Sequence, residues 1–302
     1  LLEPQPDRTR PTVCSKILKT SRQEINFQTQ LNLERFLNDL TTSLKKVLTE
    51  LSEGGAARLR PAAVACFLSA PFYASQTRTI KQTRPAPVTV TRQLIADLVE
   101  TDWRQFQSSA PPLYHEILND AHELIERQIM QIKLNRYETR SPFGQRASEI
   151  EISHYLNVGS SRVLNRFREL LFGQWPRGKI AFHSFPFAFF TLSRDFFQTD
   201  NVLFMDIGGE VTEVSLITNE ILWETVSFPL GRNFLVRRLA EEFKTVPEET
   251  LSALKIYQRG GYNKLTNERL TEAINRCQNE WLANFKNALA ALTEKHFGSN
   301  KL

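Results

Sequence analysis

Cysteine and methionine are scarce in this chain. Its 302 residues include only three cysteines, Cys14, Cys66 and Cys277, and two methionines. The cysteines lie far apart, and no two of them have the spacing of a metal-binding or redox-active pair. The sequence therefore excludes a disulfide-stapled scaffold and a zinc ribbon, and it predicts reduced thiols in a cytosolic protein.

Long apolar runs and long basic runs are also missing. A membrane-spanning helix needs about 20 consecutive apolar residues, and no segment has that character. The 38 basic and 33 acidic residues give a net charge of +5, but they are scattered along the chain. We therefore predict no transmembrane segment, no signal peptide and no nucleic-acid groove, although mild basicity is compatible with an anionic membrane surface.

Both ends of the chain indicate a fragment. The first residue is Leu1 rather than methionine, and the last predicted element is a helix that no closing strand follows. We expect the complete protein to continue beyond both termini.

The first third of the chain has an α/β pattern. Residues 12–19 alternate like a strand, residues 30–51 carry apolar side chains at helical spacing, and residues 62–69 form an apolar run with the length of a buried strand. Gly54 and Gly55 are expected to end the helix. This order predicts one strand–helix–strand unit with a crossover connection.

The middle third predicts a small α+β insert. Residues 83–87 contain two prolines and are interpreted as a linker, and Thr91 is the expected N-cap of a helix. The insert is predicted to contain strands at 88–90, 123–134 and 149–155 and an amphipathic helix at 160–172.

The last third alternates strands and helices. Its predicted strands cover residues 179–183, 201–207, 212–218 and 220–228, and its predicted helices begin near Pro186, after Gly231, at Pro247 and at Thr266. The final helix carries an apolar stripe, which we interpret as a packing surface.

The segment from Asn201 to Thr218 is the most informative. A hydrophobic strand ends in Asp206, Gly208 and Gly209 follow, and a second strand begins without an intervening helix. A Rossmann loop or a P-loop would continue from the glycines into a helix, so any phosphate-binding surface here is the tip of a hairpin. Glycine allows a close approach of backbone N–H groups to an anion, and Asp206 is placed to hold a divalent cation through water. The alternative interpretation is an ordinary hairpin with a Gly-Gly turn.

The order of these parts resembles the actin, Hsp70 and sugar-kinase superfamily, and its details resemble the FtsA and PilM branch of bacterial actin-like proteins. The resemblance covers nearly the whole chain and depends more on order and spacing than on any one motif. The stretches that carry it, besides the hairpin, are residues 67–78 (Phe-Leu-Ser-Ala-Pro-Phe-Tyr-Ala-Ser-Gln-Thr-Arg), residues 134–147, and residues 228–233 (Phe-Pro-Leu-Gly-Arg-Asn).

The resemblance implies a fold and a domain division. The expected fold class is α/β, an incomplete actin-like (ribonuclease H-like) ATPase fold with an inserted SHS2-like α+β domain. The expected domains are residues 1–84 and 179–302 as two actin-like subdomains and residues 85–178 as the insert.

The resemblance also implies ATP and Mg²⁺ as cofactors, held between the two actin-like subdomains. Asp206 would coordinate Mg²⁺ through water, and the backbone of the turn would contact the β- and γ-phosphates. Other residues would supply a hydroxyl group or contacts to the ribose and adenine. The complete implied set is Asp206, Ile207, Gly208, Gly209, Thr212, Gly231, Arg232 and Lys255, and no catalytic residue is assigned.

Two positions depart from the pattern of the family. Glu210 stands where a small residue is common, and Ser252 stands where many relatives have an acidic residue. A carboxylate about 4 Å from a phosphate charge would cost about 4 kcal/mol at an effective dielectric constant of 20. Either the Glu210 side chain points away from the phosphates, Mg²⁺ offsets its charge, or nucleotide binding is weak.

The implied function is assembly at the cytoplasmic face of the inner membrane. An FtsA-like protein would tether a division ring through an FtsZ-like partner, and a PilM-like protein would support type IV pilus assembly through inner-membrane proteins; either could polymerise. A weak ATPase and a degenerate scaffold without hydrolysis both remain open. A sugar-kinase-like phosphotransferase is disfavoured because residues 62–82 offer no catalytic aspartate.

Other candidate sites are weaker. His115 and His122 could share a helix face, but no third metal ligand has suitable spacing. Ser69 and Ser75 lack the Gly-x-Ser-x-Gly turn of a hydrolase nucleophile. His183 lies in an expected strand and is interpreted as a core histidine with a hydrogen-bond partner.

Overall fold

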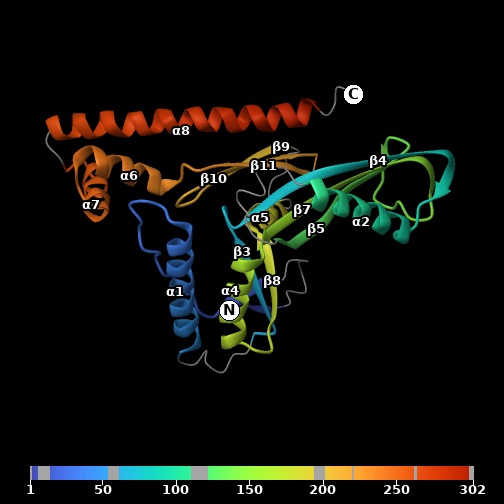
Figure 1. The fold of residues 1–302 in the computed structure, drawn as a ribbon, viewed down its shortest axis with the longest axis horizontal. Coiled ribbons are helices and arrows are strands. Elements are labelled where there is room, and N and C mark those ends of the chain that lie inside the picture. Colours follow the sequence, from blue (N-terminus) through green and yellow to red (C-terminus); the bar gives the residue numbers. More distant parts are fainter. Residues whose placement is uncertain are drawn as a thin grey trace. The chain divides into compact units, whose positions relative to one another are not determined.

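The structure is a computed structural model (Figure 1). The predicted helix stop at Gly54 and Gly55 and the candidate His115 lie outside the residues that it describes. Those residues are 2–5, 14–53, 61–109, 122–193, 201–219, 221–261 and 264–298.

By its packing contacts the chain divides into two compact units. Unit 1 comprises Leu1–Cys66 and Ser161–Phe182, and unit 2 comprises Phe67–Ser160 and His183–Leu302. The predicted division at residues 84 and 178 does not coincide with these units and stays a prediction. Each unit is described by itself below.

Unit 1 contains two long helices and two short pairs of strands. Strands β1 (Leu2–Gln5) and β2 (Cys14–Ile17) pair antiparallel. Strand β3 (Ala63–Leu68) pairs instead with β8 (Lys179–Ser184), so the predicted crossover unit, in which β2 and β3 would share a sheet, is wrong. Periodicity identified the strands but could not identify the partner of β3, which lies more than 100 residues away in the sequence.

The prediction of a buried strand at 62–69 is also wrong in part. Ala63, Ala65 and Phe67 are exposed, and Leu68 alone in β3 is fully buried. Because β3 belongs to a two-stranded sheet, one of its faces lacks a covering layer among the residues that the structure describes.

The long helices of unit 1 pack on each other. In α1 (Leu33–Ser52), the Asn32 side chain accepts a hydrogen bond from the Arg35 amide and so caps the first turn. Helix α4 (Ser161–Gln174) contributes Leu164 and Leu171 to the buried interior, and its Arg162 contacts Glu34 across the two helices. Both helices confirm the sequence prediction.

In unit 2, a four-stranded antiparallel sheet has the order β4–β7–β5–β6. Helix α2 (Arg92–Ser109) packs on one face, where its Ile95 and Val99 meet Ile132 and Ile152. Thr91 caps α2 by accepting a hydrogen bond from the Leu94 amide at 3.1 Å, as predicted. The strands of this sheet are β4 (Tyr73–Thr89), β5 (His122–Leu134), β6 (Tyr137–Glu138) and β7 (Arg146–Ser160).

The predicted linker at 83–87 is wrong, because these residues lie within β4. The pairing of β4 with β7 shifts register between Thr83, which faces Glu149, and Val88, which faces Ala147. Pro85 and Pro87 fall inside this irregularity, where the missing N–H groups of proline break no ladder hydrogen bond. The two prolines therefore mark an irregularity inside one strand.

The second sheet of unit 2 has the order β11–β10–β9 and contains the predicted hairpin. Strands β9 (Asn201–Ile207) and β10 (Thr212–Thr218) are antiparallel with no helix between them, and β11 (Ile221–Phe228) follows on the other side of β10. The short helix α5 (Phe185–Ser193) contacts β9, since the rings of Phe189 and Phe204 stack with their centroids 3.7 Å apart.

Three helices complete unit 2, as predicted. They are α6 (Arg232–Phe243), α7 (Pro247–Gln258) and α8 (Lys264–Gly298). Helix α8 lies along the second sheet (Figure 1), where its Ala288 and Leu292 bury Val214 and Phe228. The first turns of α8 pack on α6 and α7 instead, so Leu239 and Leu270 belong to a separate helical core.

Candidate functional site

The tip of the β9–β10 hairpin is a tight turn over residues 208–211. The Gly208 amide donates a hydrogen bond of 2.9 Å to the Val211 carbonyl. A Cβ atom added at Gly208 would lie 2.9 Å from that same carbonyl oxygen, so the turn leaves no room for a side chain at this position. The predicted hairpin geometry of Gly208 and Gly209 is therefore confirmed.

Helix α6 begins directly against this tip. The amides of Gly231, Arg232 and Asn233 donate hydrogen bonds of 3.0, 2.9 and 2.8 Å to the carbonyls of Glu210, Gly208 and Gly209, respectively. The first N–H groups of a helix have no partner within the helix. Here the carbonyls of the turn satisfy them and fix the orientation of the turn.

Two backbone donors of the turn itself have no partner among the residues that the structure describes. Within the described parts of the chain, the amides of Gly209 and Glu210 form no hydrogen bond. A buried N–H group without a partner is costly, whereas one at an accessible turn can bind water or an anion. The turn thus presents two backbone donors, and its carbonyls are already used by α6.

Gly231 permits this close approach. A Cβ atom at position 231 would lie 2.5 Å from both the carbonyl carbon and the oxygen of Gly209, and 2.7 Å from the carbonyl carbon of Glu210. The backbone dihedral φ at Gly231 is −93°, so lack of space rather than conformation requires glycine here.

Glu210 points toward helix α6 and not toward the donors of the turn. Its carboxylate accepts hydrogen bonds from Arg237 at 2.7 and 2.8 Å and from Asn233 Nδ2 at 2.8 Å. Burial acts to raise the pKa of Glu210, but the hydrogen bonds from Arg237 and Asn233 and the charge of Arg237 outweigh it and lower that pKa. Of the three possibilities raised for Glu210, the structure supports the first, so its charge is neutralised by Arg237.

Replacing Arg237 by methionine should destabilise unit 2 by about 2 kcal/mol, because it leaves the buried Glu210 carboxylate with Asn233 as its remaining partner. The matched control is Arg238→Met, which removes an exposed pair with Glu280 and should cost about 0.5 kcal/mol or less. Urea unfolding of both variants measures the difference, and equal losses would contradict the role assigned to Arg237.

Asp206 lies at the end of β9, directly opposite Glu213 on β10. It is half-buried, and burial raises its pKa. Glu213 is 4 % exposed, and both of its carboxylate oxygens accept a hydrogen bond from the Tyr73 hydroxyl, at 2.7 and 2.8 Å. The Ala70 amide adds a third hydrogen bond at 3.2 Å. Burial, opposed by these hydrogen bonds and reinforced by the charge of Asp206, raises the pKa of Glu213 to about 7.

Sequence reasoning missed Glu213 and Tyr73. Neither residue belongs to a short motif, and they are 140 positions apart. The available signal was a glutamate inside a predicted strand that also contains Val214, Leu216 and Ile217, and a carboxylate in such a strand is buried only when it has a partner.

Thr212 is fully buried and has a packing role. Its hydroxyl donates to the Leu230 carbonyl at 2.7 Å and accepts from the Trp281 indole at 3.2 Å. These contacts tie the start of β10 to the turn before α6 and to α8. The one hydroxyl proton of Thr212 is used within unit 2, and a contact between this hydroxyl and a ligand stays a prediction.

The remaining predicted residues are divided between two places. Gly231 and Arg232 lie beside the turn, and the Arg232 side chain is exposed there. Lys255 is exposed on α7, and no hydrogen bond or ion pair links it to the turn among the residues that the structure describes. The structure therefore brings together Asp206, Ile207, Gly208, Gly209, Gly231 and Arg232, but not Lys255.

A second buried polar cluster surrounds Glu126 on β5. Its carboxylate accepts hydrogen bonds from the Ser184 amide and hydroxyl, both at 3.0 Å, and from Asn157 at 3.1 Å, and it lies 2.7 Å from His183 Nδ1. His183 thus has the predicted partner, although its side chain is 36 % exposed. The cluster joins β5, β7 and β8 within unit 2.

The turn fits a phosphate group, and one carboxylate fits a hydrated metal ion. The fit to phosphate depends on the two amides without a partner in the described residues, the absence of side chains at residues 208 and 209, and the turning away of Glu210. No cluster of three or more metal-ligating side chains occurs in the described ranges. A Mg²⁺ ion here would therefore need oxygen ligands from a nucleotide and water in addition to Asp206.

The chain has an actin-like ATPase fold, which defines a structural class without assigning an activity. No family model matches the sequence, and no curated protein matches it either. The similarity is to solved structures.

One of these is the PilM–PilN type IV pilus biogenesis complex, in which a chain superimposes with a TM-score of 0.54 at 16% sequence identity. The match covers 84% of this chain and 63% of that chain, so this chain spans less than two thirds of its neighbour. Another is a protein of unknown function from Bacteroides thetaiotaomicron VPI-5482 with an actin-like ATPase fold, at 10% identity and a TM-score of 0.30, covering 68% of this chain and 63% of that one.

Proposed function

We propose that this chain binds the phosphates of a nucleotide at the β9–β10 turn and acts as an actin-like assembly protein. The observation that carries the proposal is the turn itself: two backbone donors without a partner in the described residues, in a turn held by three hydrogen bonds from the start of α6. Such donors are pre-oriented, so binding an anion requires little reorganisation of the protein.

ATP with Mg²⁺ is the proposed cofactor. The amides of Gly209 and Glu210 would contact phosphate oxygens, and Asp206 would hold the metal ion through water. Arg232, exposed beside the turn, adds a positive charge near these phosphates. Lys255 would contact the base only if the nucleotide extends along α7.

Type IV pilus assembly, with a PilN-like inner-membrane protein as partner, is the proposed setting. The fold similarity to the PilM–PilN complex favours it over the FtsA-like role in cell division, although 16% identity is too low to transfer a function. No helix in the described ranges is long and apolar enough to span a bilayer. The proposed location is the cytoplasmic face of the inner membrane, reached through this partner.

Replacing Asp206 by alanine should weaken binding of Mg²⁺ and a fluorescent ATP analogue about tenfold, because the carboxylate is the metal ligand contributed by the turn. The control is Asp97→Ala, which removes an exposed carboxylate on α2. Fluorescence anisotropy with and without Mg²⁺ measures both. Equal affinity of the Asp206→Ala and wild-type proteins would remove Asp206 from the site.

The partner needs a separate test. The purified chain should retain the cytoplasmic segment of a PilN-like protein from the same genome and should not retain its FtsZ. Retention of FtsZ alone would instead support the division role. Measurement of phosphate release by the nucleotide-bound protein would distinguish a weak ATPase from a scaffold that binds without hydrolysis.

A further inference from the structure

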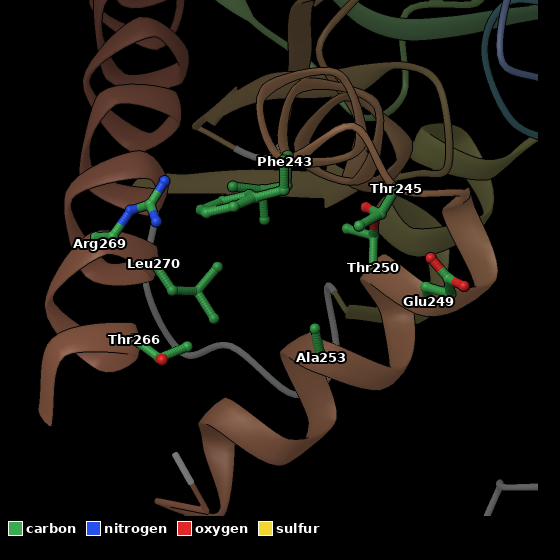
Figure 2. Close-up of a pocket in the computed structure, with 9 residues that line it drawn as sticks. Phe243, Thr245, Glu249, Thr250, Ala253, Thr266, Arg269 and Leu270 are labelled. Atoms are coloured by element: carbon green, nitrogen blue, oxygen red, sulfur yellow. The ribbon is translucent and has the colours of Figure 1, made fainter. Parts of the chain in front are cut away.

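A cavity of about 260 Å³ lies within the helical part of unit 2 (Figure 2). Helix α6 contributes Leu239 and Phe243, α7 contributes Ala253, and α8 contributes Leu270. Leu239 and Leu270 are 1 % and 6 % exposed, so the floor of the cavity is part of the buried helical core. The remaining lining residues are Thr245, Glu249, Thr250, Thr266 and Arg269.

The size and lining of the cavity suit an apolar group the size of a ring. An apolar cavity of about 150 Å³ is enough for benzene and stays free of water. Phe243, Ala253 and Leu270 surround the space in Figure 2, and the small side chain of Ala253 leaves its α7 side open. An occupant would therefore gain apolar burial on three sides.

Two of the hydroxyl groups in the lining need no ligand. Thr245 and Thr250 hydrogen-bond to each other at 2.8 Å, and Thr250 also donates to the Val246 carbonyl at 3.2 Å. Because these hydroxyl groups already have hydrogen-bond partners, a ligand on this side of the cavity does not need to supply a polar group.

The rim of the cavity carries one positively charged and one negatively charged side chain. Arg269 and Glu249 lie on opposite sides of the space (Figure 2). Among the residues that the structure describes, Arg269 forms no ion pair, and its guanidinium lies 5.9 Å from the centre of the Phe243 ring. An anionic group is attracted to the Arg269 side and repelled from the Glu249 side, so the rim orients a ligand with one negative charge.

We propose that this cavity binds a small aromatic or branched aliphatic monocarboxylate. The apolar body lies among Phe243, Ala253 and Leu270, and the carboxylate pairs with Arg269. Lys255, on the side of α7 turned away from Ala253, does not line the cavity, so the proposed site is separate from the nucleotide site and does not depend on it.

Titration with 3-phenylpropanoate, followed by ligand-detected NMR, tests the proposal. We expect saturable binding, with an affinity at least tenfold higher than that of the uncharged 3-phenylpropanol and with no binding of 3-phenylpropylamine. Arg269→Gln should weaken 3-phenylpropanoate about tenfold, whereas Arg276→Gln, two turns further along α8 and outside the cavity, should leave the affinity unchanged.

A cavity-filling substitution tests the apolar part. Ala253→Leu should abolish binding, while Ala283→Leu on the exposed face of α8 should not; far-UV circular dichroism confirms that both variants fold. Because Arg269 is exposed, its variant is informative even if Ala253→Leu fails to fold. Absence of saturable binding, or equal affinities of the carboxylate and the alcohol, would overturn the proposal.

Discussion

Gly231→Ala is expected to destabilise unit 2 by about 3 kcal/mol and to abolish nucleotide binding at the turn. The added Cβ would lie 2.5 Å from the Gly209 carbonyl, so the turn must move away from α6. That movement breaks the hydrogen bonds from the amides of Arg232 and Asn233 and misdirects the two donors of the turn. Urea unfolding and the anisotropy assay measure the two effects.

The matched control is Gly173→Ala in α4. A Cβ atom at Gly173 would have no neighbour within 4 Å, and alanine favours a helix more than glycine does. This variant should gain about 0.5 kcal/mol and bind nucleotide normally. A Gly231→Ala protein with wild-type stability and wild-type nucleotide affinity would show that the tight contact between α6 and the turn has no functional importance.

The stability of unit 2 should fall as the pH rises from about 4.5 to 7, through ionisation of Glu213. The folded protein holds this carboxyl group at a pKa of about 7, above the ordinary value of 4.5, so over this range the native state retains a proton that the unfolded state has lost. Unfolding is therefore favoured by rising pH, by about 3 kcal/mol over the whole window.

Glu213→Gln isolates this contribution. The amide oxygen of glutamine can still accept hydrogen bonds from Tyr73 and Ala70, but the side chain does not ionise. The variant and the wild type should have similar unfolding free energies at pH 4.5, and the variant should be more stable by about 3 kcal/mol at pH 8. Parallel pH profiles for the two proteins would show that Glu213 does not retain its proton.

The sequence predicted the elements of unit 2 well because their signals are local. Asp206, Gly208 and Gly209 lie within four residues, and the absence of a helix after them was enough to predict a hairpin. The Pro229–Gly231 turn likewise predicted the start of α6. The actin-like fold follows from the order of such elements.

Long-range partners could not be predicted in this way. The partner of Glu210 is Arg237, 27 residues away on a helix surface, and nothing in the local pattern indicates that the glutamate turns toward it. The pairing of β3 with β8 could not be predicted for the same reason, because the two strands lie more than 100 residues apart in the sequence. The prediction from Pro85 and Pro87 was wrong for a different reason, since prolines mark both linkers and strand irregularities and the sequence alone does not distinguish the two.

Hydrogen bonds connect the start of α6 directly to the hairpin turn. Three amides of the first turn of the helix are satisfied by three successive carbonyls of the hairpin, and Gly231 leaves no gap between them. A shift of the turn is therefore coupled to the start of α6. A ligand that displaces the turn must either move the first residues of α6 with it or break these three hydrogen bonds.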